Sequence, residues 1–253
     1  MMVPGERKQQ ILALLERKRY VTVEELSTEL FVSLPTVRRD LAALEQEGAL
    51  TRTHGGASYN QAGTQVAPFI LREKNNYEEK QIIGNIAAGL IENGDTLFIS
   101  SSSTTLAMVR QLSPDLHMQV LTNGMTMAQV IGQYPNANVY IPAGHYTYED
   151  DGIYGPDVVE SVSKRFAKYG FICCDGVDME HGLTVNRDTE LFLELAFRKN
   201  CEKLVLLVDH TKFDTHFFYQ SMELSEVDIL VTDQDPGEKW EAYCRKQKIE
   251  LLY

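Results

Sequence analysis

The stretch "SLPTVRRDLAALEQEGALTRTHGG", residues 33–56, decides how the first part of this chain folds. Its apolar residues recur every three or four positions, which predicts an amphipathic helix over 34–47 with one buried face. Ser33 suits the N-cap of that helix, and Pro35 is tolerated in its first turn. The inward side chains are expected to be Leu34, Val37, Leu41 and Leu44. This stripe turns Arg38 and Arg39 toward solvent.

The flanking residues complete a small domain. Two further apolar patterns, in "ERKQQILALLERK" (6–18) and "TVEELSTEL" (22–30), predict two helices that share a core with the third. Thr22 and Glu25 have the spacing of a capping box, and only "FVS" (31–33) separates the second helix from the third. After Gly48, "ALTRTHGGAS" (49–58) combines strand formers with a glycine pair, which predicts a hairpin. Three helices and a hairpin are typical of a winged helix-turn-helix.

This arrangement predicts DNA binding. In a helix-turn-helix, the first residues of the second helix approach base edges, and arginine offers a fork of donors that matches guanine or a phosphate. Residues on the hairpin are placed to contact the flanking backbone. The candidate DNA-binding residues are therefore Ser33, Pro35, Thr36, Arg38, Arg39, Arg52 and His54. The alternative is a solvated helix face on which Arg38 or Arg39 pairs with Asp40 or Glu45; the helices, short turn, arginines and hairpin together favour DNA.

Charge divides the chain of 253 residues in two. Its net charge is −12, yet residues 1–60 hold eight basic and eight acidic residues, so the remaining 16 basic and 28 acidic residues carry all the excess. A neutral segment with clustered arginines can approach DNA, whereas an acidic remainder is repelled from it. The four cysteines lack metal-site spacing, and no apolar run approaches the length of a membrane span. We expect reduced thiols, no metal, no membrane contact and a cytoplasmic location.

The rest of the chain alternates between helix-like and strand-like segments. Helices are expected at 77–92, 104–112, 125–134, 156–167, 189–199 and 237–247. Between them lie short apolar runs such as "TLFIS", "GFICCDG" and "KLVLLVD". Such alternation predicts an α/β domain whose mainly parallel sheet is covered on both faces. We place a DNA-binding domain at 1–57, a linker at 58–69 and the α/β domain at 70–253.

The motifs of the first domain resemble a known family. "VSLPTVRRDLAALEQEG" contains the pattern S-x-x-T-[IV]-R-R-D-L, and "LTRTHGGA" contains R-x-H-G-G. Both resemble, nearly position by position, the winged helix-turn-helix of the DeoR family of bacterial transcriptional regulators. "PFILREKNNYEEKQIIGNIAAGLIENGDTLFIS" is similar to that family's entry into its effector domain. The resemblance thus covers essentially the whole chain.

The resemblance implies a fold and a role for the second domain. In the family this domain shares the fold of ribose-5-phosphate isomerase, glucosamine-6-phosphate deaminase and coenzyme A transferases. It senses a phosphorylated sugar or related metabolite, and binding changes DNA affinity. For this chain the resemblance implies a sequence-specific regulator, a repressor, without cofactor or enzymatic activity. A double-stranded operator with two half-sites further implies a homo-oligomer, a dimer or tetramer.

The loop "SSSSTTLA" (100–107) is the first candidate effector site. It follows a predicted strand and opens a predicted helix, where free backbone N–H groups and hydroxyls can hold a phosphate. The candidates are Ser101, Ser102, Ser103, Thr104 and Thr105. The alternative is that Ser102 or Ser103 only caps the helix. The family usually has D-x-G-[ST]-T here, so this chain departs from the pattern, as it also does in "IPAGH" (141–145).

Three more segments match the family's strand-end loops. "LTNG" makes Asn123 and Gly124 candidates, although Asn and Gly are also ordinary turn residues. "CCDGVDMEHGLT" and the following helix supply Asp175 and Glu190, which we expect to contact sugar hydroxyls. "LVLLVDHTKFD" places Lys212 after a strand, where its ammonium is expected to meet a phosphate; His210 has no assigned role.

Other functions are less well supported by the sequence. An isomerase- or deaminase-like enzyme that carries a helix-turn-helix could use Asp175, Asp178, His181 and Glu190 in proton transfer. A regulator with a degenerate pocket is a third hypothesis. The chain contains no G-x-x-x-x-G-K-[ST], H-E-x-x-H or G-x-S-x-G motif. The acidic run Glu149–Asp151 is interpreted as a solvated loop rather than a metal site.

Overall fold

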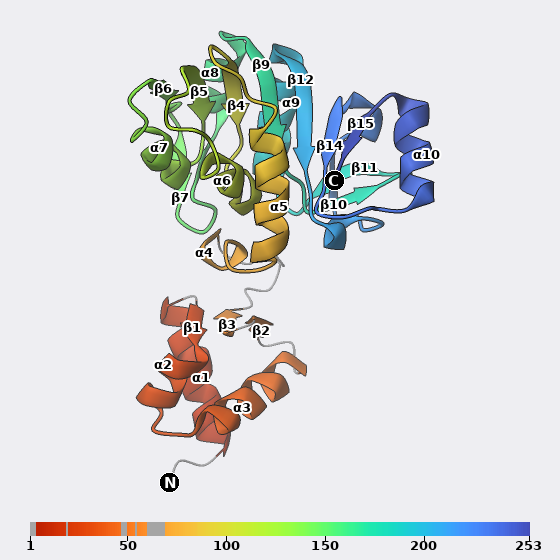
Figure 1. Cartoon of the computed structure of the whole chain (residues 1–253). Helices are drawn as coiled ribbons and strands as arrows, with labels where there is room; N and C mark the ends of the chain where they lie inside the picture. The colour runs from red at the N-terminus through yellow and green to blue at the C-terminus, as the bar shows by residue number, and fades with distance from the viewer. Residues whose placement is uncertain (1–3, 19, 47–49, 54, 60–68) are drawn as a thin grey trace. The chain divides into compact units, whose positions relative to one another are not determined.

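The structure is a computed structural model that describes residues 4–18, 20–46, 50–53, 55–59 and 69–253. The chain divides into two compact units, one that ends at Leu71 and one that begins at Arg72. None of the described helices is long and apolar enough to cross a membrane. Figure 1 labels the elements of both units.

The first unit is a helix-turn-helix with a β-hairpin. Its helices are α1 (Pro4–Lys18), α2 (Val23–Glu29) and α3 (Leu34–Gln46), and its strands are β1 (Tyr20–Thr22), β2 (Leu50–Thr53) and β3 (Gly56–Tyr59). The strands form an antiparallel sheet in the order β1-β3-β2 (Figure 1). The three predicted helices and the predicted hairpin are therefore confirmed. His54 and Gly48 lie outside the described residues.

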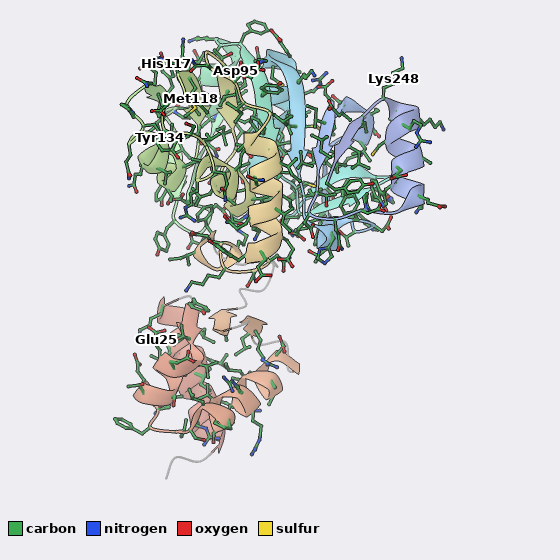
Figure 2. All side chains as sticks on the ribbon, in the orientation of Figure 1. Glu25, Asp95, His117, Met118, Tyr134 and Lys248 are labelled. Carbon is green, nitrogen blue, oxygen red and sulfur yellow. The ribbon has the colours of Figure 1, made fainter. Side chains whose placement is uncertain are left out.

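The core of the first unit contains most of the predicted apolar residues. Val37, Leu41 and Leu44 are buried, but Leu34 is 37 % exposed, so its assignment to the core is wrong. Leu34 is the first residue of α3, where the helix has not yet turned that face inward. The connection before it comprises residues 30–33, one more than expected, because Leu30 caps α2. The Thr22–Glu25 capping box is confirmed, and Figure 2 labels Glu25.

A buried ion pair joins the first helix to the third. The Arg7 guanidinium donates from Nε and Nη2 to the two carboxylate oxygens of Asp40, with an Nη2–Oδ1 distance of 3.0 Å. Both side chains are about nine-tenths buried, and the hydrogen bond to Asp40 raises the pKa of Arg7. A bidentate pair of this kind fixes two planar groups in one orientation. It therefore sets how α3 is held against α1.

The second unit is built on a parallel sheet. Within the described residues its seven strands have the order β15-β14-β12-β9-β4-β5-β6, and every recorded pairing is parallel. The strands are β4 (Thr96–Ile99), β5 (Met118–Thr122), β6 (Ala137–Tyr140), β9 (Ala167–Ile172), β12 (Cys201–Leu207), β14 (Ile229–Val231) and β15 (Glu250–Leu252). The α/β fold class predicted from the alternating pattern is confirmed.

Helices cover both faces of this sheet. The six predicted helices are present as α5 (Tyr77–Ala88), α6 (Ser103–Val109), α7 (Met125–Ile131), α8 (Pro156–Ser163), α9 (Asp188–Asn200) and α10 (Glu238–Gln247); a short α4 (Phe69–Arg72) precedes them. Figure 1 shows α5, α6 and α7 on one face and α8 and α9 on the other. Helices α5 and α6 pack closely at Gly84, where a Cβ would lie 2.8 Å from the backbone carbon of Ala107.

Two smaller sheets border the carboxyl edge of the main sheet, and the sequence pattern did not reveal them. One is the hairpin of β7 (His145–Thr147) and β8 (Gly152–Tyr154), and the other joins β10 (Gly176–Asp178), β11 (Gly182–Val185) and β13 (Tyr219–Met222). Their strands have three or four residues, too few for a clear period. The hairpin carries the acidic run Glu149–Asp151 between its strands.

The proposed domain limits stay a prediction. Of the expected linker at 58–69, residues 58 and 59 belong to β3 and residue 69 begins α4. Residues 60–68 lie outside the described part of the chain.

Replacing Asp40 with alanine should destabilise the first unit by about 3 kcal/mol, because the buried Arg7 guanidinium loses its two hydrogen bonds to the carboxylate. Amide hydrogen exchange of α3 in the full-length chain measures this loss. Arg39→Ala, on the exposed face of the same helix, is the control and should change stability by less than about 0.5 kcal/mol. Equal protection in the two variants would show that the ion pair does not hold α3.

Candidate functional site

The predicted DNA-binding helix exposes the two central arginines. Arg38 and Arg39 lie on the exposed face of α3, whereas their neighbours Val37 and Asp40 are buried. Within the described part of the chain, no hydrogen bond or ion pair is recorded for either guanidinium. The two acids that were expected to neutralise them are engaged elsewhere, since Asp40 binds Arg7 and Glu45 binds Arg52. The expected pairing of Arg38 or Arg39 with Asp40 or Glu45 is therefore wrong, whereas the exposed face itself fits both hypotheses and DNA contact by these residues stays a prediction.

The other DNA-binding candidates surround these arginines. The hydroxyl groups of Ser33 and Thr36 form a hydrogen bond of 2.9 Å at the start of α3, and Pro35 between them in sequence is exposed. Arg52 on β2 is exposed and lies 3.5 Å from the Glu45 carboxylate, a weak surface pair. His54 lies outside the described residues. Among the described members of the set, Ser33, Pro35, Arg38, Arg39 and Arg52 are exposed, and Thr36 is half-buried.

A second candidate site lies at the carboxyl edge of the parallel sheet. Three loops meet there, after β4, after β5 and between β7 and β8. The Ser101 backbone N–H donates to Asn123 Oδ1 at 2.8 Å, and Asn123 Nδ2 donates to the Ile153 carbonyl at 3.2 Å. The Ser101 hydroxyl lies 3.0 Å from the Asp150 carbonyl and 3.1 Å from that of Asp151. Buried hydrogen bonds therefore fix the three loops relative to one another.

A small polar pocket opens between these loops and α9. It is lined by Arg72, Ser100, Ser101, Ser102, Asn123, Tyr154, Cys173, Cys174, Asp175, Glu190, Leu193 and Glu194. The structure therefore brings together Ser101, Ser102, Asn123, Asp175 and Glu190 from the predicted effector-binding set. The remaining candidates, Ser103, Thr104, Thr105, Gly124 and Lys212, do not line it.

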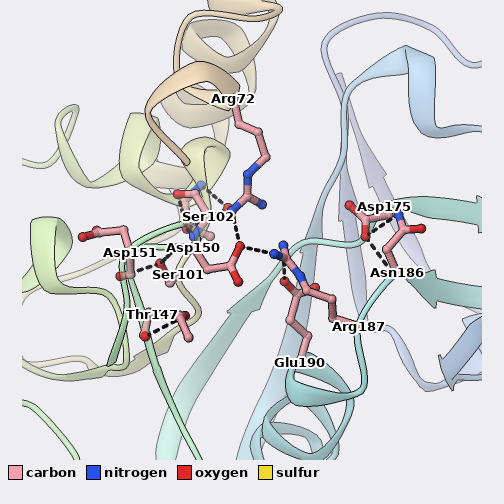
Figure 3. A network of polar contacts seen from close by, with 12 residues as sticks. Arg72, Ser101, Ser102, Thr147, Asp150, Asp151, Asp175, Asn186, Arg187 and Glu190 are labelled. Carbon is pink, nitrogen blue, oxygen red and sulfur yellow. Dashed lines mark hydrogen bonds and ion pairs between the residues drawn. The ribbon is translucent and has the colours of Figure 1, made fainter. Parts of the chain in front are cut away.

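An ion network links two residues of the pocket lining, Arg72 and Glu190, to residues outside it, as Figure 3 shows. The Asp150 carboxylate binds two arginines, Arg72 at 3.3 Å and Arg187, and Arg187 also lies 3.3 Å from Glu190. The side chain of Asp150 is 7 % exposed and those of its partners 17–19 %. Charge thus links Arg72 on α4, Asp150 in the β7–β8 hairpin, and Arg187 and Glu190 at the start of α9.

The interpretation of Glu149–Asp151 as a solvated loop is wrong for its last two residues. Asp150 and Asp151 are both buried. Asp151 accepts hydrogen bonds from the Thr126 backbone N–H at 2.8 Å and from the Tyr146 hydroxyl at 3.2 Å. The two aspartates accept hydrogen bonds from arginine, tyrosine and backbone groups inside the unit. Composition alone does not distinguish such buried acids from acids on the surface.

The serine-rich loop uses much of its polar capacity internally. Ser102 caps α6, where its hydroxyl accepts from the Thr105 N–H at 3.0 Å, and it lies 2.9 Å from the Cys173 thiol. Thr105 is fully buried and donates to the Ser100 carbonyl at 2.7 Å. Helix capping, the alternative weighed for this loop, is therefore observed at Ser102. Gly124 likewise donates its N–H to Thr122.

Burial controls the titration of the acids and thiols in the pocket. The pKa of Glu190 is raised to about 7, mainly by burial; the carboxylates of Asp175 and Asp150 act in the same direction, and Arg187 and Arg72 oppose them. Burial also raises the pKa of Glu194 well above its usual range. The pKa of the Cys173 thiol rises to about 11 for the same reason, so the thiol is protonated at neutral pH.

Cationic groups gather beside the pocket. Lys80 on α5 is buried and donates to the backbone carbonyls of Arg72 and Asn75, the latter at 2.6 Å. Burial, together with the neighbouring Lys212 and Arg72 charges, lowers the pKa of Lys80 to about 8. Lys212 ends a 3₁₀ turn, His210–Lys212, after β12. His210, which had no expected role, lies 2.7 Å from Asp233, and this hydrogen bond raises its pKa.

One group among the described residues could hold a metal ion. Asp178, His181 and His216 each offer a ligand atom, and these atoms lie within 4.8 Å of one another. The two imidazoles stack with centroids 4.6 Å apart, and Asp178 Oδ1 already accepts from two backbone N–H groups at Glu180 and His181. The histidines are exposed, unlike the pocket residues. The sequence expectation of no metal is not tested by this arrangement.

Sequence reasoning missed several residues of the pocket and its ion network. Asp150 lies in the run interpreted as a solvated loop, Arg187 lies just before the predicted helix 189–199 and Glu194 lies within it. Arg72 follows the expected linker, and none of these four residues was a site candidate. Only Glu194 carried a usable signal: it follows Glu190 by four residues, so both share one face of α9. The others require knowledge of which loops meet at the sheet edge.

Comparisons with known proteins match both units. A family model described as "DeoR-like helix-turn-helix domain" matches residues 7–62, and one described as "DeoR C terminal sensor domain" matches residues 75–234. The chain is similar to the HTH-type transcriptional repressor GlcR of Bacillus subtilis, with 32% identity over 99% of this chain and 96% of the relative. It is 34% identical to the HTH-type transcriptional regulator GolR of Listeria innocua, over 92% of this chain and 91% of the relative.

A third relative and two solved structures complete the comparison. The glycerol-3-phosphate regulon repressor of Escherichia coli is 29% identical over 93% of both chains. Ribose 5-phosphate isomerase A of Methanocaldococcus jannaschii is 15% identical, covers 55% of both chains and gives a TM-score of 0.41. The beta subunit of eIF2B from Chaetomium thermophilum is 12% identical over 84% of this chain and 59% of that chain, with a TM-score of 0.49.

The raised pKa of Glu190 predicts a pH-dependent stability. Its carboxyl binds a proton in the folded state that it releases in the unfolded state between pH about 4.5 and 7, so the free energy of unfolding should fall as pH rises through this window. Glu190→Gln should remove up to about 3 kcal/mol of this fall. Urea unfolding at pH 5, 6, 7 and 8 measures it, with the exposed Glu202→Gln as control. Parallel pH profiles for wild type and Glu190→Gln would contradict the assignment.

Proposed function

This chain belongs to the DeoR family of transcriptional regulators, and on that premise we propose that it is an operator-specific repressor whose DNA affinity is modulated by a phosphorylated sugar or related metabolite. The observation that carries the proposal is the exposed pair Arg38 and Arg39 on α3, whose neighbouring acids are engaged by Arg7 and Arg52. Both guanidinium groups remain available for base edges or phosphates.

The proposed operator contact consists of the α3 surface and the hairpin. Ser33, Pro35, Thr36, Arg38 and Arg39 occupy the first two turns of α3 and its N-terminal flank, the part of a helix-turn-helix that enters the major groove. Arg52 and His54 are proposed to contact the flanking phosphates. The balanced charge of residues 1–60 supports this assignment, because the acidic excess lies elsewhere.

The proposed effector site is the pocket at the carboxyl edge of the sheet. Ser101, Ser102, Asn123, Asp175 and Glu190 line it and offer hydroxyl, amide and carboxyl groups to a hydroxylated ligand. The proposed set is completed by residues that do not line the pocket: Ser103, Thr104 and Thr105 in the first turn of α6, Gly124 before α7 and Lys212 in the turn after β12. Arg72 and Arg187 supply positive charge nearby, which supports an anionic ligand. No resident cofactor is proposed.

Turnover of the ligand is the competing function. Glu190 favours it, because a carboxyl group with a pKa of about 7 is suited to general acid–base chemistry. The relatives, however, are named as transcriptional regulators. We therefore propose binding without turnover; conversion of an effector by the purified protein would overturn this part.

The proposed active form is a cytoplasmic homo-oligomer, a dimer or tetramer. Operators read by paired helix-turn-helix units have half-sites about 34–36 Å apart, so two copies are needed to engage both. An effector that prefers one quaternary arrangement would shift the population between DNA-competent and incompetent forms.

A mobility-shift assay tests the proposal directly. DNA selected by the protein from a random-sequence pool serves as the operator, and a panel of sugar phosphates is scored for release of that DNA. Selection of one sequence class and its release by a panel member are the expected results. A protein that enriches no sequence is not an operator-specific regulator.

Arg38→Ala should weaken binding to the selected DNA by about 1–3 kcal/mol and relax selectivity at one base position, if Arg38 reads a base. Repeated selection with the variant measures both effects. Equal weakening on every sequence, with a shallower salt dependence, would assign Arg38 to a phosphate instead.

Lys212→Ala should abolish release of DNA by the effector and leave effector-free DNA binding unchanged, because Lys212 belongs to the second unit. The matched control is Lys203→Ala, an exposed lysine on β12. A collapse of effector-free binding in Lys212→Ala alone would make Lys212 structural.

A further inference from the structure

Glu194 is the most deeply buried charged residue that lines the pocket. It lies on α9, 3 % exposed, one turn after Glu190, and both belong to the pocket lining. Its Oε2 atom has no hydrogen-bond partner among the described residues, whereas Ser221 is a hydrogen-bond neighbour of the carboxyl group. A buried oxygen without a partner is costly and rare in native proteins.

The surroundings do not explain why a carboxyl group stands here. The neighbouring side chains on α9, Leu193 and Ala196, are buried apolar residues of the main core. Phe197 on the same helix packs on Phe98 in that core. No cation is recorded in an ion pair with Glu194 within the described part of the chain. An apolar residue of similar size would satisfy the packing, so the carboxyl group has a use other than stability.

We propose that Glu194 is a ligand-recognition residue that hydrogen-bonds a hydroxyl group of the effector in the pocket. This inference rests on the proposed sensing function and deepens it. Burial and the Glu190 carboxylate raise the pKa of Glu194 well above its usual range, which favours the protonated form, and a protonated carboxyl group both donates and accepts. A sugar hydroxyl also donates and accepts, which makes the two groups complementary.

The geometry then assigns the two ends of the ligand. Arg72 and Arg187 lie toward the ion network around Asp150, where an anionic group is attracted, while Glu194 lies among apolar residues of α9. A ligand with a phosphate at one end and hydroxyl groups at the other can interact with both the arginines and Glu194. Inorganic phosphate can interact only with the arginines.

The experiment compares melting temperatures of the full-length protein with inorganic phosphate, glycerol 3-phosphate and hexose 6-phosphates. For wild type, we expect at least one hydroxylated phosphate to raise the melting temperature more than inorganic phosphate does. Glu194→Leu should lose this extra shift, which corresponds to at least a tenfold loss of affinity, and keep any response to inorganic phosphate. The control is Glu202→Leu, an exposed glutamate on β12.

The melting temperature without ligand provides a second, ligand-independent arm. Because the substitution removes an unsatisfied buried oxygen, Glu194→Leu should melt at or above the wild-type temperature. A fall of more than a few degrees would make Glu194 a structural residue and overturn the inference. Glu194→Gln tests the recognised group: an amide also donates and accepts, so a hydroxyl ligand keeps binding to it. Loss of the extra shift in Gln as well as in Leu overturns the hydroxyl assignment.

The remaining outcomes separate this inference from the proposed function. An unchanged extra shift in Glu194→Leu overturns the role of Glu194 and leaves sensing intact. No extra shift in wild type overturns hydroxyl recognition, and the mobility-shift assay then decides independently whether the protein is an operator-specific regulator.

Discussion

The carboxylate of Asp150, shared by two arginines, is the interaction on which the second unit's site depends. It joins Arg72, at the start of the unit, to Arg187, which precedes α9, and its own loop is fixed to the end of β4 through Ser101. Removing these charges from water costs free energy, and their mutual attraction offsets that cost only when the partners are well placed. The network therefore fixes positions rather than maximising stability. A parallel sheet brings its strand ends to one edge, but the charges decide how the loops meet there.

At the proposed effector site, the same network would favour an anionic ligand. Two guanidinium groups are already desolvated and oriented, so a ligand does not have to order them. Asp150 occupies them in the structure, and an incoming phosphate must therefore share or replace a carboxylate. This competition lowers affinity but gives selectivity for ligands with more charge than a carboxylate. The acids Glu190 and Glu194 farther along α9 disfavour a second anionic group and favour hydroxyl groups instead.

The sequence predicts elements that have a clear period and fails where contacts are non-local. Helices of both units and the strands of the parallel sheet follow from apolar spacing, and the Thr22–Glu25 cap follows from local chemistry. Ser101 was a candidate because its loop follows a predicted strand and opens a helix, whereas Asn123, Asp175 and Glu190 were candidates because their segments match the family's loops; all four line the pocket. Asp150 and Arg187 were missed because a charged residue in a loop looks the same whether it is solvated or paired across 37 residues. Leu34 failed for a different reason, since apolar spacing does not say where a helix begins to face its core.

The first unit shows how neutral composition can still present positive charge. Residues 1–60 contain equal numbers of acids and bases, so a count alone predicts no attraction to DNA. Ion pairing changes the local charge. Asp40 pairs with Arg7 in the core and Glu45 pairs with Arg52 on the hairpin, while Arg38 and Arg39 face solvent. The local charge of the α3 surface is therefore positive although the segment is neutral. Because Asp40 follows Arg39 directly, one short motif both anchors the helix through its acid and presents the arginines on the opposite face.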